Sequence, residues 1–234
     1  METYLENLAM KLNINLSKIQ VDNFMKYKTI LLETNKFLNL TSITDDKDVI
    51  LKHFIDSLTI NSYITQNSSL IDVGTGAGFP GIPIKIIRSD VSLTLLDSLQ
   101  KRVNFLSNVV NELSLDSVNL IHGRAEDIGK IKEYRENFDF VTARAVANSS
   151  TLSELCLPFV KVNGLFICMK GSIEEELDEA KNAINALGGE IEKIEEFNLP
   201  DTDIKRTVIL IRKIKNTPTK YPRKAGLPAK EPIK

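Results

Sequence analysis

The 234-residue sequence has no tryptophan and only two cysteines, Cys156 and Cys168. Two thiols are too few for a disulfide framework or a zinc site, and both lie in apolar segments, so we expect reduced, buried side chains. Two histidines make a transition-metal site equally unexpected. No apolar run reaches the roughly 18 residues that cross a membrane, and the first ten residues lack the basic and apolar regions of a signal peptide. These absences predict a cytoplasmic protein without a membrane partner.

Acidic residues are scarce at one end of the chain. Residues 205–234 contain ten Lys or Arg and one acid, whereas residues 1–204 contain 20 basic and 30 acidic residues. Four prolines interrupt the basic segment 217–234, which predicts an extended strap rather than a helix. Such a strap suits a polyanion such as a phosphate backbone, and a solvated tail that only aids solubility is the alternative.

The hydropathy pattern divides the chain into three parts. Residues 1–64 are predicted to form a helical extension, residues 65–215 an α/β core and residues 216–234 the basic tail. Ser17 and Gln20 form a capping-box pattern. The predicted helices are 18–38, 47–63, 81–88, 99–113, 149–160 and 173–187, and the predicted strands are 69–73, 92–96, 118–121, 138–142, 164–169, 190–197 and 206–213. This alternation favours a mostly parallel sheet, and the closely spaced last two strands predict an antiparallel hairpin at its edge.

A glycine-rich turn follows the first predicted strand. The segment LIDVGTGAGFPG places Gly74, Gly76, Gly78 and Gly81 where a nucleotide-like ligand can approach backbone amides. Residues 76–81 match the dinucleotide fingerprint G-x-G-x-x-G, a weak signal by itself. Prolines at 80 and 83 remove amide donors that a pyrophosphate would need, which disfavours a nicotinamide dinucleotide.

Two acidic markers follow the next two strands. Asp97 is the first polar residue after the second predicted strand and is placed to accept hydrogen bonds from both ribose hydroxyls, although Asp97 or Ser98 could also cap the helix over 99–113. The segment GRAED after the third strand offers Ala125 and a carboxylate of Glu126 or Asp127 to an adenine ring edge. A polar loop in which Asp127 caps a short helix is the alternative. Three consecutive strand ends are therefore expected to line one crevice.

Together, these three markers resemble those of a class I S-adenosylmethionine-dependent methyltransferase with a Rossmann-like sheet. Nearly the whole chain further resembles the bacterial family of 16S ribosomal RNA guanine-N7 methyltransferases once called glucose-inhibited division protein B. The similar segments are NKFLNLTSI (35–43), HFIDSL (53–58), DVGTGAGFPGIP (72–83), LDSLQKR (96–102), GRAED (123–127), TARAVA (142–147), LPFVKVNG (157–164), KG (170–171) and KYPRKAGLPAKEPI (220–233).

The resemblance implies S-adenosylmethionine as cofactor, with contacts at positions that match Gly74, Phe79, Ala125, Glu126 and Arg144. Gly76, Gly78 and Asp97 join this candidate set from the residue pattern alone. The implied substrate is 16S ribosomal RNA or the small-subunit particle, and no obligatory protein partner is inferred. Five tail residues are candidates for binding RNA: Lys220, Tyr221, Arg223, Lys224 and Lys230.

The expected chemistry is an in-line methyl transfer that depends on placement, because guanine N7 has an exposed lone pair and no proton to lose. No catalytic residue is assigned. His53 and Asp56 lie one helical turn apart, but a packed, hydrogen-bonded histidine is the favoured interpretation of His53. Arg144 could hold the cofactor carboxylate, donate a hydrogen bond to guanine O6 or stack on a base. A nicotinamide-dependent oxidoreductase and a non-catalytic RNA-binding module are the alternative functions.

Overall fold

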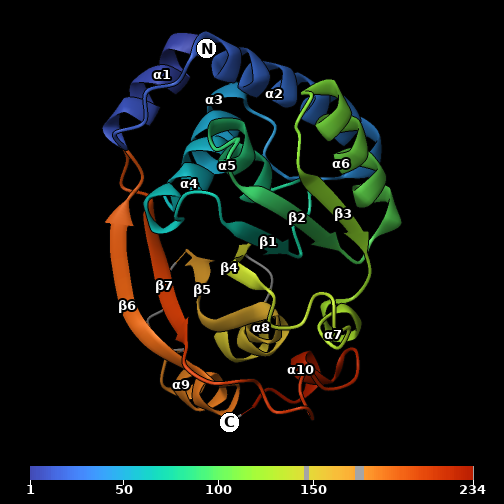
Figure 1. Ribbon diagram of the computed structural model, residues 1–234. Helices are drawn as coiled ribbons and strands as arrows, with labels where there is room; N and C mark the ends of the chain where they lie inside the picture. The colour runs from blue at the N-terminus through green and yellow to red at the C-terminus, as the bar shows by residue number, and fades with distance from the viewer. Residues whose placement is uncertain (145–147, 172–176, 234) are drawn as a thin grey trace.

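The computed structural model describes residues 1–144, 148–171 and 177–233. Its centre is a seven-stranded sheet with the order β3-β2-β1-β4-β5-β7-β6 (Figure 1). Strands β1 to β5 are parallel, and β7 is antiparallel to both β5 and β6. The strands are β1 (Ser69–Val73), β2 (Ser92–Asp97), β3 (Val118–His122), β4 (Phe138–Arg144), β5 (Val160–Lys170), β6 (Gly189–Asn198) and β7 (Lys205–Lys213). The predicted fold class, including the antiparallel edge hairpin, is confirmed.

The strand order reverses next to β1. The chain builds β1, β2 and β3 outward in one direction and then returns to place β4 on the other side of β1. In open parallel sheets this reversal leaves a crevice at the carboxyl ends of the strands, where ligands bind. The topology therefore directs attention to the residues that follow β1, β2, β3 and β4.

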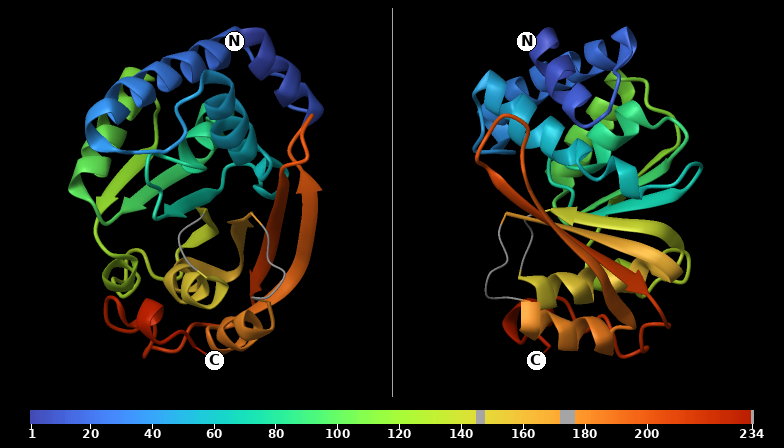
Figure 2. Two further views of the ribbon diagram at one scale, coloured as in Figure 1. Left: turned by 180° about the vertical axis from the view of Figure 1, so that it is seen from behind. Right: turned by 90° about the vertical axis from the view of Figure 1, so that its left-hand side faces the viewer.

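Helices cover both faces of the sheet (Figure 2). They are α5 (Gly81–Ile87), α6 (Gln100–Glu112), α7 (Ala125–Ile128), α8 (Ser149–Cys156), the 3-10 helix η3 (Leu157–Phe159) and α9 (Leu177–Ala186). Alternate strand residues face opposite sides, so Leu70 belongs to one buried cluster and Ile71 to the other. The predicted helix 149–160 is wrong beyond Cys156, where the turn tightens around Pro158, and the first residues of predicted helix 173–187 lie outside the described part of the chain.

The N-terminal extension packs on the face that carries α5 and α6. It consists of α1 (Glu2–Lys11), α2 (Lys18–Leu38), α3 (Asp46–Val49), the π-helix η1 (Ile50–Ile55), α4 (Asp56–Leu58) and the 3-10 helix η2 (Asn61–Tyr63). Ser17 and Gln20 close a reciprocal capping box at the start of α2, as predicted. Phe24 and Phe54 of the extension lie in one buried cluster with Leu70 and Leu95 of the sheet, so the two parts share a core.

The segment predicted as one helix over 47–63 is interrupted. Asp45 caps it, because its side chain accepts hydrogen bonds from two backbone amides of the first turn. A π-helical turn then widens the backbone over Ile50–Ile55, where the amide of Asp56 donates to the carbonyl of Leu51. Single π-helical turns are frequent at functional sites because they reorient side chains. His53 lies in this turn.

The tail crosses α8 and ends near it. Residues 214–226 have no regular structure, but Leu227–Lys230 form one helical turn, α10. The expectation of a wholly extended strap is therefore wrong at this point, because Pro228 lies in the first turn, where a helix does not need its missing amide. The hydroxyl of Thr151 in α8 donates to the carbonyl of Pro228 and fixes this turn against the core.

Both cysteines are buried, and neither is in a disulfide bond, as predicted. Within the described residues, no helix combines the length and apolar character needed to cross a bilayer. Over the same residues, no group of three or more His, Cys, Asp or Glu is placed to hold a metal ion.

Candidate cofactor and substrate site

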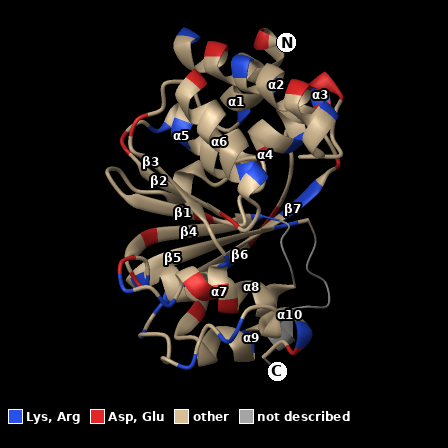
Figure 3. Cartoon of the chain, turned by 90° about the vertical axis from the view of Figure 1, so that its right-hand side faces the viewer, with Lys and Arg blue, Asp and Glu red and all other residues tan. Residues whose placement is uncertain are grey.

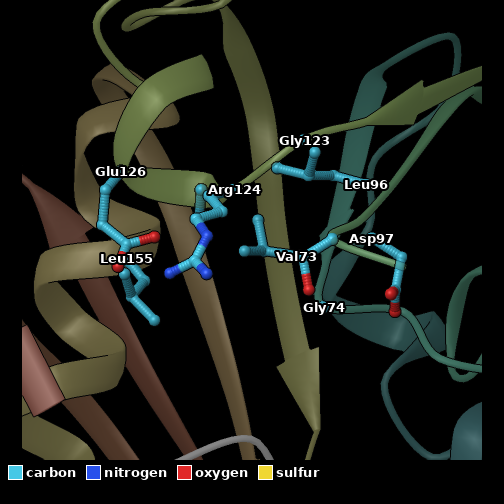
Figure 4. A pocket seen from close by; sticks show the side chains of 10 residues that line it. Val73, Gly74, Leu96, Asp97, Gly123, Arg124, Glu126 and Leu155 are labelled. Atoms are coloured by element: carbon cyan, nitrogen blue, oxygen red, sulfur yellow. The ribbon is translucent and has the colours of Figure 1, made fainter. Parts of the chain in front are cut away.

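The ends of β1, β2 and β3 line a cavity of about 270 Å³ (Figure 4). Gly74, Asp97, Ala125 and Glu126 all border it. Asp97 lies on one side of this cavity and Glu126 on the other. The structure thus brings together the three markers that the sequence placed after three consecutive strands.

A second cavity of about 380 Å³ continues from the first. The two share Gly74 and Asp97 among their lining residues, and the second also borders Gly76, Phe79 and Arg144. They form one trough along the strand ends, from Glu126 at one end to Arg144 at the other. Seven of the eight predicted cofactor residues line this trough.

The glycine loop has the conformation that its glycines permit. Gly74 and Gly76 have φ angles of 69° and 63°, in the left-handed region. A Cβ atom on Gly76 would meet no heavy atom within 4 Å, so the loop borders open space at this residue.

Gly78 is the predicted cofactor residue that lies outside both cavities. A Cβ atom there would lie 2.7 Å from Ile82 and 2.8 Å from the hydroxyl of Tyr27, so this glycine serves close packing of the extension. Gly81 has a similar role, because its Cβ would lie 2.5 Å from Leu95 of β2. The prediction that Gly78 contacts cofactor has no support in its position.

Asp97 is 2% exposed, and its carboxylate is hydrogen-bonded to the backbone of the glycine loop. Its Oδ2 accepts the amide of Gly76 at 2.9 Å and the guanidinium of Arg102 at 3.3 Å, and its Oδ1 accepts the amide of Leu99 at 2.9 Å. The alternative role as a helix cap is not seen, because α6 begins after Leu99 and no side chain caps it. A carboxylate accepts about four hydrogen bonds, which leaves room for a ribose hydroxyl.

Glu126 connects the trough to the tail. Its Oε1 accepts the backbone amide of Gly226 at 2.8 Å, although the two residues are 100 positions apart. The carboxylate that was predicted to contact adenine is thus also a docking point for the tail. The short helix α7 begins at Ala125 after Arg124, and not after Asp127 as the alternative interpretation of this segment supposed.

Arg144, His53 and Phe79 form a compact cluster at the far end of the trough. The imidazole of His53 stacks on the Phe79 ring at a centroid distance of 4.4 Å, and the Arg144 guanidinium lies 5.1 Å from the same centroid. Arg144 donates to Nδ1 of His53 at 3.1 Å and to the carbonyl of Lys52 at 3.0 Å. The π-helical turn supplies both of these acceptors.

These contacts define the protonation state of His53. A guanidinium cannot accept a hydrogen bond, so Nδ1 must be the acceptor and the proton must be on Nε2, which donates to Thr41 Oγ1 at 2.8 Å. Burial, and then the charge of Arg144, lower the pKa of His53 to about 3. His53 is therefore a neutral, packed histidine, as predicted.

Asp72 lies under the glycine loop with an unsatisfied oxygen. Its side chain is fully buried, and Oδ2 accepts the Thr75 hydroxyl at 2.7 Å and the Gly81 amide at 2.9 Å. Oδ1 has no hydrogen-bond partner among the described residues. Burial raises the pKa of this carboxyl to about 6. Asp72 lies on β1, one residue before its end, and no sequence motif marks it as a functional residue.

A third cavity, of about 330 Å³, lies beyond the Arg144 cluster. It shares His53 and Arg144 with the trough and is bordered further by Lys52, Asp56 and Arg206. Asp56 is nearly buried and pairs with Arg144 at 3.2 Å and with Arg206 at 3.0 Å. The sequence analysis assigned no role to Asp56 or Arg206, because residues 150 positions apart give no spacing signal.

The tail residues divide into two groups. Lys220, Lys224 and Lys230 are exposed, and the Lys220 ammonium lies 5.1 Å from the ring centroid of the half-buried Tyr221. Arg223 instead forms a bidentate pair with Glu154 of α8, whose side chain is 1% exposed. The Arg223 cation is thus neutralised within the fold, which removes the ground for expecting it to contact RNA phosphate.

Comparison with known proteins identifies the family. The model of the GidB family, rRNA small subunit methyltransferase G, matches residues 20–206. The chain belongs to this family. The rRNA small subunit methyltransferase G of Alkaliphilus oremlandii is 53% identical over 229 residues, which cover 97% of this chain and 96% of that protein. The corresponding protein of Acetivibrio thermocellus is 54% identical over 221 residues, covering 94% and 91%.

Solved structures agree on the fold of this rRNA small subunit methyltransferase G family member. A SAM-dependent methyltransferase from Aquifex aeolicus superposes with a TM-score of 0.55 at 17% identity, covering 75% of this chain and 97% of that one. NSun6 from Pyrococcus horikoshii, solved with SFG, gives a TM-score of 0.55 at 11% identity, covering 69% and 51%. The family resemblance seen in the sequence is confirmed.

Proposed function

We propose that this protein transfers the methyl group of S-adenosylmethionine to N7 of a guanine in 16S ribosomal RNA. The observation that carries the proposal is the trough along the ends of β1, β2 and β3, which ends at Arg144 against the third cavity, lined by several basic side chains. A cofactor in the trough and a base in the adjoining cavity would meet at the cluster of Phe79, His53 and Arg144. Family membership supports the same reaction class.

The residues of the trough fit the proposed cofactor. Glu126 and the backbone at Ala125 suit the adenine edge, and Asp97 can accept a ribose hydroxyl beside the Gly76 amide. The open space at Gly76 would be filled by a side chain at that position. The unpartnered Oδ1 of Asp72 favours a ligand that brings positive charge close to the glycine loop.

The protein's contribution to the chemistry is placement. S-adenosylmethionine supplies an electrophilic methyl group on a sulfonium, and guanine N7 attacks without losing a proton, so no general base is needed. His53 agrees with this, because its low pKa and its bonds to Thr41 and Arg144 leave it as a fixed neutral spacer. Arg144 and Phe79 would hold the boundary between cofactor and base.

The proposed partner is 16S ribosomal RNA or the small-subunit particle, in the cytoplasm. Three exposed lysines of the tail, Lys220, Lys224 and Lys230, support phosphate contact, with Tyr221 beside Lys220. Figure 3 shows the basic residues of the tail in blue on the side of the sheet that carries α7 and α8. Since Gly226 is bonded to Glu126, RNA held by this tail would lie close to the cofactor trough.

The decisive experiment uses small-subunit RNA from cells that lack this protein. We expect that RNA to be missing one N7-methylguanine, and the purified enzyme with S-adenosylmethionine to restore it. N7-methylguanine is detected by chemical cleavage of the strand or by mass spectrometry of nucleosides. Unchanged methylation in the deletion strain would contradict the proposal.

Calorimetry distinguishes the alternative functions. We expect S-adenosylmethionine and its demethylated product to bind and NADH not to bind. Binding of NADH would favour an oxidoreductase, and binding of neither cofactor together with RNA binding would favour a non-catalytic module.

A further inference from the structure

One acidic side chain borders the third cavity among several basic ones. Asp56 borders it together with Lys52, Arg144 and Arg206. The Asp56 side chain is 4% exposed, and each oxygen is bound by a different guanidinium, Oδ1 by Nε of Arg206 at 3.0 Å and Oδ2 by Arg144 at 3.2 Å. Asp56 holds two arginines in place, and the same carboxylate borders the cavity, where it would repel a phosphate but could accept hydrogen bonds from a nucleic-acid base.

The Asp56–Arg206 pair presents a hydrogen-bond acceptor beside a donor. Each carboxylate oxygen accepts about two hydrogen bonds, so one arginine on each leaves capacity on both. Guanine is complementary to this arrangement, because its O6 acceptor lies beside its N1–H and N2–H donors. Adenine held in the same orientation would place its amino donor where guanine has O6 and its N1 acceptor where guanine has N1–H, and would oppose both groups.

The two arginines also fix the position of this carboxylate. Arg144 is held by the carbonyl of Lys52 and by His53, and Arg206 by the carbonyl of Lys205. Because Arg144 and Arg206 are fixed, the carboxylate of Asp56 is preorganised. A base that does not donate to it leaves part of the hydrogen-bonding capacity of this nearly buried carboxylate unused. Such sites discriminate strongly between a base that offers the donors and one that lacks them.

We propose that Asp56 recognises the acceptor guanine by accepting hydrogen bonds from its N1–H and N2–H groups. This inference rests on the proposed function and adds a base-specificity residue to it. With the Watson–Crick edge on Asp56, the imidazole side of the purine is left free, and N7 can face the boundary at His53 and Arg144 that the cavity shares with the trough. Methyl transfer at N7 and recognition of the opposite edge are then compatible in one pose.

The test compares guanosine with inosine, which lacks only the 2-amino group, at the target position of a small-subunit RNA. For the wild-type enzyme we expect kcat/KM to be about ten- to a hundredfold lower with inosine, as for loss of a hydrogen bond to a charged group. In Asp56→Asn, we expect kcat/KM with guanosine to fall by a similar factor and the ratio between the two substrates to shrink to below about threefold. Equal rates of wild type on both substrates, or a ratio unchanged in the variant, would overturn the inference.

Two controls make the outcome specific. Asp46→Asn changes an exposed acid of the same segment that pairs with Lys28, and it should leave the substrate ratio unchanged. If Asp56→Asn alone is unstable because two cations lose their partner, the double variant Asp56→Asn with Arg206→Gln restores the charge balance, and a wild-type substrate ratio in that variant would also overturn the inference.

A further substrate separates this inference from the proposed function. With 7-deazaguanosine at the target position, the wild-type enzyme should transfer no methyl group, because the acceptor nitrogen is replaced by carbon. Methylation of that RNA would contradict the N7 reaction itself. An inactive 7-deaza substrate together with an unchanged inosine ratio would contradict only the role of Asp56.

Discussion

At the scale of single residues, we expect Asp72, which lies buried under the glycine loop, to make cofactor binding depend on pH. Burial raises the pKa of its carboxyl to about 6, so below that pH the folded protein holds a neutral Asp72 and above it an ionised one. A cationic ligand binds the ionised form better. We therefore expect the affinity for S-adenosylmethionine to increase about tenfold between about pH 5 and about pH 7, a range in which the ammonium and carboxylate of the ligand change little.

Calorimetry of wild type and Asp72→Asn across this range checks the prediction. Asn keeps an oxygen for the amide of Gly81 but does not titrate, so the variant should have weaker and pH-independent affinity. Without cofactor, the free energy of unfolding should change with pH in the opposite direction to the cofactor affinity. A carboxyl with a raised folded-state pKa loses stabilisation as pH rises from about 4 to about 6, so the wild type should lose unfolding free energy there relative to the variant. A pH-independent affinity of the wild type would refute the role of Asp72.

Two glycines of one loop should respond differently to a methyl group. Gly76→Ala places a Cβ in open space, so its cost to folding is the left-handed backbone alone, about 1 kcal/mol, while it occupies cofactor space. Gly78→Ala drives a Cβ to within 2.7 Å of Ile82 at a φ of 101°, and should cost about 2 to 4 kcal/mol. Urea unfolding measures both stability costs, and calorimetry measures the affinity for S-adenosylmethionine. Relative to the stability that each variant loses, Gly76→Ala should lose more of this affinity than Gly78→Ala. The reverse order would show that Gly76 does not face the cofactor.

The residues that the sequence predicted and those that it missed differ in how they are placed. Gly74 directly follows β1, Asp97 is the last residue of β2 and Glu126 lies in the short helix after β3. Parallel pairing brings such strand ends together without further information. Asp56 and Arg206 meet only because the extension folds over the sheet next to β7. Packing of that kind has no period or spacing in the sequence, so a single chain without its structure does not reveal it.

At the scale of elements, one ion pair holds the tail on α8. Arg223 binds the buried carboxylate of Glu154 through two nitrogens and donates to the carbonyl of Glu231. Removing Arg223 leaves Glu154 buried without its partner, so Arg223→Ala should lower the free energy of unfolding by about 3 kcal/mol. Limited proteolysis should then cleave the tail faster than in wild type.

The matched control is Arg212→Ala. Arg212 pairs with Glu192, but both side chains are over a third exposed, so the loss should be below about 1 kcal/mol. Equal losses in the two variants would show that the tail is not anchored through Glu154.

The predicted elements are most accurate where hydrophobic periodicity is strong. The strand over 69–73 and the helix over 18–38 agree with β1 and α2 to the residue, because a buried run and a capping box mark their ends. The segment predicted as one helix over 47–63 contains a π-helical turn. One extra residue in a turn does not change the helix-favouring composition of a segment, so the sequence does not predict it. The helical turn α10 differs from the predicted extended tail, because a proline in the first turn of a helix is compatible with helix formation.

At the scale of the whole molecule, the basic C-terminal segment 205–233 contains fewer unpaired charges than its composition suggests. Of its nine basic residues, all within the described part of the chain, four are paired with acids of the body: Arg206, Arg212 and Lys213 of β7 with Asp56, Glu192 and Glu136, and Arg223 of the tail with Glu154. These pairs anchor the last strand and the tail. The phosphate-binding charge must then come from the exposed lysines, which stand against an acidic body that repels RNA elsewhere.

Salt dependence tests this division of labour. If Lys224 and Lys230 each neutralise one RNA phosphate, Lys224→Ala and Lys230→Ala should each weaken RNA binding and reduce the slope of log K against log salt by about 0.7 to 0.9. The affinity for S-adenosylmethionine should not change, because neither side chain borders the trough. Lys18→Ala is the control, since Lys18 is exposed on the N-terminal helices at the opposite end of the molecule from the tail (Figure 1). Equal slopes for all three variants would mean that RNA binds away from the tail, and that its lysines serve solubility only.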